Sequence, residues 1–170
     1  KDKNLFNEVN IGGTENILKA CKKNGVRKLI YTSSSAIYGI PNNNPVTEKM
    51  LPKPMESYGL AKYIAEKKCE EYISEDLNIV IIRPRTILGH GRLGIFQILF
   101  EWILQGNNIP VLGRGDNLYQ FIHADDLAEA IILSADQDIK SGVYNCGAEE
   151  YGTMREVLEQ LCEYSNTNSN

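Results

Sequence analysis

Residues 78–83, Asn-Ile-Val-Ile-Ile-Arg, decide the fold class of this 170-residue chain. The four apolar residues in this run are all β-branched, which is the pattern of a strand that is buried on both faces. Strands of this kind belong to parallel sheets, in which a crossover helix connects each strand to the next. The run is far too short to span a membrane, so we place it inside a sheet.

The segments on either side of this run alternate between helical and strand patterns. Helices are expected at 4–24, 57–75, 93–106, 124–135 and 153–164, and strands at 27–33, 109–112, 119–123 and 142–146. Helices of ten or more residues between short strands predict an α/β fold with a parallel sheet. We expect a boundary near 84–92, because the pattern is less regular in the second half.

The composition is that of a globular domain, with 42% hydrophobic and 24% charged residues and a formal net charge of −4. These values argue against a disordered or membrane-embedded chain. No Lys/Arg-rich run supplies the basic surface that binds nucleic acid. The four cysteines are too far apart for a metal site or a disulfide framework, so we expect reduced thiols in a cytoplasmic protein. With only two histidines, no metal site is expected.

Tyr58 and Lys62 form the first candidate for chemistry. They lie one helical turn apart at the start of the helix expected at 57–75, so their side chains share a face. A nearby ammonium group favours the phenolate and lowers the pKa of a tyrosine, which can then move a proton to or from a hydroxyl or carbonyl. The alternative is a surface tyrosine beside a solvated lysine.

Three serines, Ser33 to Ser35, follow the strand expected at 27–33. Ligands of open parallel sheets bind beyond the carboxyl ends of the strands, where these hydroxyl groups could bind a substrate oxygen. The alternative is a hydroxyl-rich turn.

Residues Gly89 to Gly94 match the Gly-x-Gly-x-x-Gly pattern of dinucleotide-binding loops. Pro84 ends the preceding strand several residues too early for that motif, and no strand ending in an acidic residue follows at the spacing of the ribose partner. We therefore interpret these glycines as part of a loop on the substrate side.

Several motifs in the same order resemble one family. They are Asn10-Ile11-Gly12-Gly13-Thr14, Ser33-Ser34-Ser35-Ala36-Ile37-Tyr38-Gly39, Ser57-Tyr58-Gly59-Leu60-Ala61-Lys62, Ile81-Ile82-Arg83-Pro84 and Phe121-Ile122-His123-Ala124-Asp125-Asp126. Together they resemble the extended short-chain dehydrogenase/reductases, the NAD-dependent epimerase/dehydratase family, over essentially the whole chain. The resemblance implies the C-terminal part of a Rossmann-type parallel sheet with crossover helices, plus a smaller α/β substrate-binding region.

The resemblance also implies roles for individual residues. Ser34, Tyr58 and Lys62 correspond to the catalytic serine, the acid/base and the lysine that lowers the tyrosine pKa. The implied contacts to NAD come from these three residues and from Asn10, Ser33, Pro84 and Arg85. NADP remains open, because the residues that discriminate it belong to the Gly-rich N-terminal half of the family, which this sequence lacks. We therefore expect a fragment, with residues 1–88 as the second part of the NAD-binding domain and 89–170 as the substrate-binding region, from which strands and helices return to the main sheet.

The turn after the serines indicates which branch of the family is resembled. Ser35 and Ala36 occupy positions where the dehydratases carry acids, and the pattern is closest to the UDP-glucose 4-epimerases. A nucleotide sugar is the implied substrate, and a homodimer is implied for the full-length protein. The implied substrate-binding residues are Ser35, Thr86, Arg92, Arg114 and Tyr119. Tyr119 and Gln120 stand where epimerases carry an Arg-Asp pair.

Two alternatives stay open. The apolar helix at 95–104 also resembles 3β-hydroxysteroid-type dehydrogenases of the same superfamily, so an NAD(P)-dependent dehydrogenase or reductase acting on an apolar hydroxy compound is possible. The chain could also be a non-catalytic NAD-fold binding module.

Overall fold

The computed structural model describes residues 3–91, 94, 96–111, 113–136 and 138–166. The described chain forms two compact units. Unit 1 contains residues up to Arg85 together with 126–146, and unit 2 contains 86–125 and the residues that follow 146. The polypeptide therefore passes between the units at 85/86, 125/126 and 146/147.

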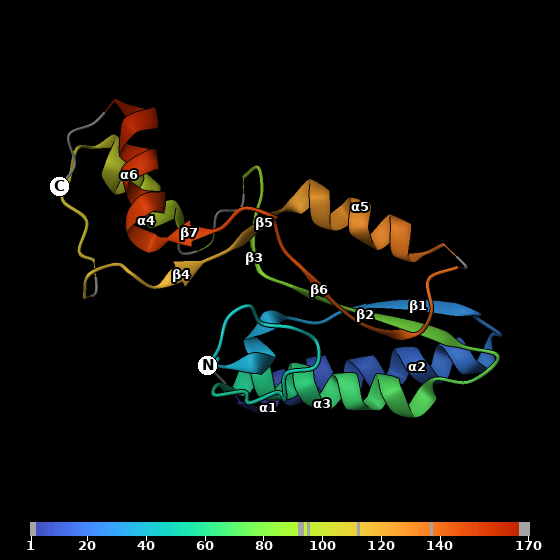
Figure 1. The fold of residues 1–170 in the computed structure, drawn as a ribbon. Helices are drawn as coiled ribbons and strands as arrows, with labels where there is room; N and C mark the ends of the chain where they lie inside the picture. Colours follow the sequence, from blue (N-terminus) through green and yellow to red (C-terminus); the bar gives the residue numbers. More distant parts are fainter. Residues whose placement is uncertain (1–2, 92–93, 95, 112, 137, 167–170) are drawn as a thin grey trace. The chain divides into compact units, whose positions relative to one another are not determined.

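Unit 1 is a parallel sheet with helices on its faces, which confirms the predicted α/β class (Figure 1). Its strands are β1 (Lys28–Thr32), β2 (Asn78–Pro84) and β6 (Gly142–Cys146), in the order β1-β2-β6. Ile81 in the central strand lies opposite Tyr31 on one side and Val143 on the other. The strand β2 is buried along almost its whole length, as its apolar β-branched run predicts.

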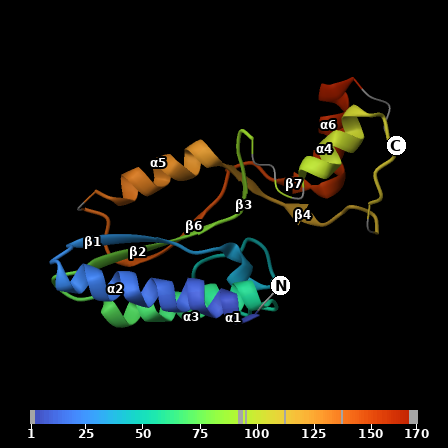
Figure 2. The same ribbon diagram turned by 180° about the vertical axis from the view of Figure 1, so that it is seen from behind.

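One helical layer covers one face of this sheet (Figures 1 and 2). It consists of α1 (Lys3–Phe6), a π-helical segment η1 (Asn7–Gly12), α2 (Gly13–Lys23) and α3 (Ser57–Tyr72). The core between this layer and the sheet is formed by Leu18, Cys21, Cys69, Leu77, Ile79 and Ile81. Fully burying a large apolar side chain stabilises the fold by about 1.5–3 kcal/mol, so this core anchors α2 and α3 to the sheet.

The first helix differs from the sequence prediction of a continuous helix over 4–24. Residues 7–12 form π-helical turns instead, within which Asn10 lies. Asn10 Nδ2 donates to the Phe6 carbonyl at 3.2 Å, and Thr14 Oγ1 donates to the Asn10 carbonyl at 2.6 Å. Both bonds join a side chain to the backbone carbonyl four residues earlier. Such segments occur frequently at functional sites.

The described residues of unit 2 form short strands and helices. Its elements are β3 (Thr86–Leu88), α4 (Phe96–Leu104), β4 (Leu118–Tyr119), β5 (Phe121–His123), β7 (Gly152–Thr153) and α6 (Met154–Ser165). The strands form a parallel pair, β3 with β5, and an antiparallel pair, β4 with β7. The helix α5 (Ala124–Ser134) begins in unit 2 and continues into unit 1. Residues 109–111, where the sequence indicated a strand, form none, and residue 112 lies outside the described part.

Aromatic rings hold the core of unit 2 together. The ring of Phe96 meets those of Tyr119 and Phe121 edge-on, with centroids 5.5 and 5.0 Å apart. Helix α6 begins with a capping box, in which the Thr153 hydroxyl accepts from the Glu156 N–H and the Glu156 carboxylate accepts from the Thr153 N–H. Local interactions therefore define the boundaries of this unit's elements.

Candidate active site

The serines lie in a tight turn directly after β1. Ser34 is the N-cap of a short 3₁₀ helix, η2 (Ser35–Tyr38), and its Oγ accepts from the Ala36 N–H at 3.2 Å. Ser33 is buried, and its N–H donates to the Ile82 carbonyl at 2.7 Å. Gly39 closes the turn at φ +62, and a Cβ there would collide with the Lys53 carbonyl oxygen. Only glycine fits this backbone conformation and this close approach.

The first turn of α3 lies directly on the serine turn. A Cβ added to Gly59 would lie 2.7 Å from the Ala36 carbonyl oxygen, so only the missing side chain allows this approach. Tyr58 precedes Gly59, and Ala36 is two residues beyond Ser34. The two motifs that the sequence placed at separate strand and helix ends are therefore adjacent in unit 1.

The Lys62 ammonium group is held beside the end of β1. Its Nζ donates to the Thr32 carbonyl at 2.7 Å and lies 4.6 Å from the centroid of the Tyr31 ring. Burial lowers the pKa of Lys62, and the negative charge of Glu66 opposes this shift. The arrangement keeps the ammonium group at the carboxyl edge of the sheet.

Tyr58 is the most exposed member of the predicted catalytic set, with 37% of its surface accessible. Its ring meets that of Phe6 edge-on, with centroids 6.0 Å apart. Ser34, Tyr58 and Lys62 thus belong to one region of unit 1. In the described part of the chain these three side chains do not hydrogen-bond to one another, and their catalytic roles remain a prediction.

The residues predicted to bind the cofactor surround the same strand ends. Pro84 is the last residue of β2 and is buried, while the Arg85 N–H donates to the Cys146 carbonyl at 2.8 Å. Three buried polar atoms in the described chain lack a hydrogen-bond partner, Tyr31 Oη, Ser33 Oγ and Arg85 Nε. Asn10 is partly buried in the π-helical segment that precedes α2.

The residues predicted to bind substrate are divided between the two units. Ser35 begins the 3₁₀ helix of unit 1 and is half-buried. In unit 2, Thr86 begins β3, Arg114 is exposed in a turn, and the Tyr119 ring is part of the aromatic core. Arg92 lies outside the described residues.

Sequence reasoning missed a buried polar network in unit 1. Glu66 of α3 is fully buried and accepts two hydrogen bonds from the Arg83 guanidinium, at 3.0 and 2.6 Å. Arg83 Nη1 also donates to the Tyr38 hydroxyl at 2.7 Å, which in turn donates to Asn145 Oδ1 at 2.8 Å. A signal existed, because an arginine inside an otherwise apolar buried strand requires an acidic partner.

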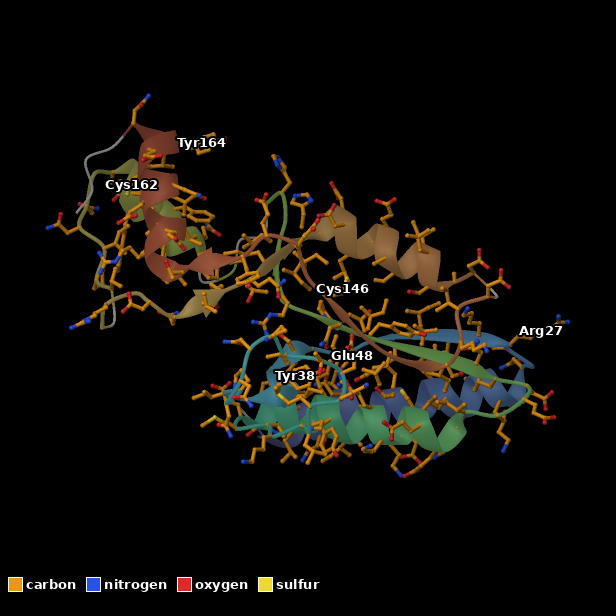
Figure 3. All side chains as sticks on the ribbon, in the orientation of Figure 1. Arg27, Tyr38, Glu48, Cys146, Cys162 and Tyr164 are labelled. Carbon is orange, nitrogen blue, oxygen red and sulfur yellow. The ribbon has the colours of Figure 1, made fainter. Side chains whose placement is uncertain are left out.

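The network continues into the loop after η2. Asn145 Nδ2 donates to the Val46 carbonyl at 3.1 Å, and the Asn145 N–H donates to Glu48 Oε1 at 2.7 Å. Figure 3 shows Tyr38 and Glu48 in this region of unit 1. The middle of this long loop is therefore hydrogen-bonded to strand β6.

A cavity of about 640 Å³ lies at the opposite, amino-terminal ends of β1 and β2. It is lined by residues 21–22, 25–27 and 71–77. It therefore lies away from the serine turn.

None of the helices in the described part of the chain is both long and apolar enough to cross a membrane.

Comparison with known proteins gives the family. The model of the NAD-dependent epimerase/dehydratase family matches residues 1–147. The uncharacterised protein y4nG of Sinorhizobium fredii is 50% identical over 99% of this chain and 43% of its own length. The mouse short-chain dehydrogenase/reductase family 42E member 1 is 36% identical over 79% of this chain and 37% of its own length.

A solved structure agrees with this match. UDP-glucuronic acid 4-epimerase from Bacillus cereus, in complex with NAD, is 28% identical with a TM-score of 0.85, over 95% of this chain and 54% of that one. The chain thus spans about half the length of that enzyme and less than half of the two relatives. With the order and placement of the motifs described above, these matches show that the chain belongs to the NAD-dependent epimerase/dehydratase family, as the sequence resemblance indicated.

Proposed function

We propose that this chain carries the catalytic residues of an NAD-dependent nucleotide-sugar 4-epimerase. The observation that carries the proposal is the close approach of Gly59 to the serine turn, which brings the helix of Tyr58 and Lys62 against Ser34. In a parallel sheet this edge is where ligands bind. The similarity to a UDP-glucuronic acid 4-epimerase of known structure supports the same reaction class.

Tyr58 acts in this proposal as the group that removes and returns the hydroxyl proton of the sugar. Its partial exposure leaves the hydroxyl group accessible to a substrate. Lys62, held by the Thr32 carbonyl, supplies a positive charge that favours the phenolate. Ser34 binds the substrate oxygen and keeps it in line with Tyr58, using the hydroxyl group that otherwise caps η2.

The residues at the strand ends fit a nicotinamide dinucleotide. Ser33 Oγ and Arg85 Nε are buried polar atoms with no partner among the described residues, and a bound cofactor would satisfy them. Asn10, Ser34, Tyr58, Lys62 and Pro84 complete the proposed contact set. The cofactor supplies a hydride acceptor for the sugar carbon. We assign NAD, which is bound in the similar UDP-glucuronic acid 4-epimerase, and keep NADP as the alternative.

The proposed substrate is a nucleotide sugar. Ser35 and Ala36 offer no carboxyl group to expel a hydroxyl from the sugar, which favours epimerisation over dehydration. From unit 2 we propose Thr86, Arg114 and Tyr119 as substrate contacts, together with Arg92, which lies outside the described residues.

We further propose that the active protein is longer than this chain, homodimeric and cytoplasmic. The chain covers 37–54% of the proteins compared above, and the Gly-rich loop of the family would lie in the preceding half. Leu5, Val9 and Ile17 in the first helical layer are large apolar residues that are exposed, which supports self-association. The four free cysteines fit a reducing compartment.

The test is the Tyr58→Phe variant of the full-length protein, assayed with NAD and a panel of UDP-sugars. The substitution keeps the ring and its contact with Phe6 but removes the ionisable hydroxyl. We expect turnover to fall by about 10²–10⁴-fold while NAD stays bound. Tyr63→Phe on the same helix, whose ring lies beside Lys67, is the matched control and should keep full activity. Near-normal turnover of Tyr58→Phe would exclude Tyr58 as the acid/base.

A second candidate is an NAD(P)-dependent dehydrogenase of an apolar hydroxy compound. It is favoured by the similarity to a mouse short-chain dehydrogenase/reductase and by Tyr119, which belongs to the aromatic core where epimerases carry arginine. The same assay separates the two, because a dehydrogenase accumulates reduced cofactor with a 3β-hydroxysteroid whereas an epimerase releases none. Cofactor binding without turnover of either substrate class would instead indicate a non-catalytic binding module.

A further inference from the structure

We propose that Arg83, Glu66 and Tyr38 form a positioning unit that holds the three segments of the proposed active site in register. The inference rests on the proposed function, because it assigns these three residues to the geometry of Ser34, Tyr58 and Lys62. None of the three residues contacts the reacting atoms in this proposal. They act through the backbone elements that carry the catalytic side chains.

The Arg83 guanidinium is the centre of the unit. Nε and Nη2 bind the two carboxylate oxygens of Glu66, and Nη1 binds the Tyr38 hydroxyl. Arg83 and Tyr38 are 4% and 3% exposed, and Glu66 is 0% exposed, so all three side chains are buried. A planar guanidinium with two partners at fixed angles fixes direction as well as distance.

Each residue of this unit belongs to a backbone segment that also carries residues of the proposed site. Glu66 follows Lys62 by four residues and Tyr58 by eight, so it lies on the same helical face one turn further along. Tyr38 ends the 3₁₀ helix that Ser34 caps. Arg83 itself directly precedes Pro84 and Arg85 at the end of β2. The Arg83 guanidinium therefore connects helix α3, which carries Tyr58 and Lys62, with the serine turn and with the end of β2, where the cofactor contacts are proposed.

The energetics favour a positioning role over a stabilising one. Removing two charges from water costs much of what their attraction returns, and buried ion pairs are often replaceable by apolar residues without loss of stability. A core of leucine and isoleucine would fill the same volume. Apolar contacts do not fix the relative orientation of the segments, whereas the three directional hydrogen bonds of Arg83 do.

The test compares single variants in the full-length protein. Arg83→Lys keeps the positive charge but loses the planar guanidinium that bonds Glu66 and Tyr38 together, and Tyr38→Phe removes only the hydroxyl group. Small displacements of catalytic groups cost up to about 10²-fold in rate, so we expect kcat to fall by roughly tenfold to a hundredfold in each. Glu70→Gln is the matched control, because Glu70 forms an exposed ion pair with Lys67 on the same helix, and it should leave kcat unchanged.

Coupling to Ser34 distinguishes positioning from general stability. In the parent protein, Ser34→Ala removes a group that is aligned with Tyr58. In the Arg83→Lys background that alignment is already lost, so Ser34→Ala should cost several-fold less. Independent, multiplicative losses would overturn the proposal. The Glu66→Met/Arg83→Met pair covers the case in which a single variant fails to fold, since it removes both charges together, and wild-type kcat in this folded variant would also overturn it.

Amide hydrogen exchange in the cofactor-free full-length protein provides a readout without activity. In Tyr38→Phe we expect faster exchange at both Ile37 and Leu60, whose N–H groups bond within the serine turn and the first turn of α3. Faster exchange in a protein that neither binds NAD nor turns over sugars would refute the proposed function and leave the positioning unit intact. Unchanged exchange in an active enzyme would refute the positioning unit alone.

Discussion

Gly59→Ala tests whether the contact between α3 and the serine turn sets catalysis. The new Cβ would lie 2.7 Å from the Ala36 carbonyl oxygen, whereas ordinary contact begins at 3.4 Å, so the helix start must move by about 0.7 Å (3.4 − 2.7). Overpacking of this kind costs about 1–3 kcal/mol. Alanine is better than glycine in a helix by about 0.5–1 kcal/mol. We therefore expect a net loss of about 1 kcal/mol in the free energy of unfolding.

The effect of Gly59→Ala on turnover should be larger than its effect on stability. A displacement of this size separates Tyr58 from Ser34, and we expect kcat of the full-length protein to fall on the order of tenfold to a hundredfold. The assays are urea unfolding and steady-state kinetics with the working substrate. Gly12→Ala is the matched control, because Gly12 has helical φ and ψ and nothing lies within 4 Å of an added Cβ. Wild-type kcat together with unchanged stability in Gly59→Ala would refute the reasoning.

Three further predictions concern other parts of the chain. Lys62→Ala should weaken NAD binding. It should also raise the apparent pKa of Tyr58 in the pH–rate profile, because the ammonium group no longer favours the phenolate. An unchanged apparent pKa in the kcat/KM profile would argue against an interaction between Tyr58 and Lys62. Thr153→Ala removes the N-cap of α6 and should cost about 1 kcal/mol in urea unfolding, whereas Thr47→Ala in an exposed loop should cost nothing measurable. Burial raises the pKa of the Cys69 thiol to about 12 from 9.0, so the unfolded chain loses this proton first and stability should fall as pH rises from 9 towards 12. Cys69→Ala should flatten that pH dependence, and a slope identical to that of the parent would show that Cys69 is not its source.

The elements that depend on local sequence were predictable. The buried β-branched run gave β2, and α3 begins at Ser57 as predicted. The strand expected at 109–112 was wrong for residues 109–111, because a short apolar stretch forms a strand only where a partner strand is available. The π-helical turns at 7–12, in which Asn10 and Thr14 bond to backbone carbonyls, are not revealed by helical periodicity.

The segments of the candidate site were predictable from the sequence, whereas the contacts that support them were not. Helical spacing paired Tyr58 with Lys62, and the family resemblance singled out Ser34; the structure brings the segments of all three together, and their catalytic roles stay a prediction. The bond between Glu66 and Arg83 joins residues from a helix and a strand that are 17 positions apart. The sequence indicates that Arg83 needs an acidic partner, but which carboxylate meets it depends on which faces of the two elements pack together, and no local pattern encodes that.

The three passages of the chain between the two units bear on attempts to exchange parts between relatives. Because unit 2 consists of 86–125 and the residues that follow 146, no single crossover point separates it from unit 1. A chimera that transplants unit 2 must replace two segments at once, with junctions at 85/86, 125/126 and 146/147. The middle junction falls within helix α5, so the donor and recipient sequences must continue the same helix across it. Recombination libraries with one breakpoint should therefore yield mostly misfolded hybrids.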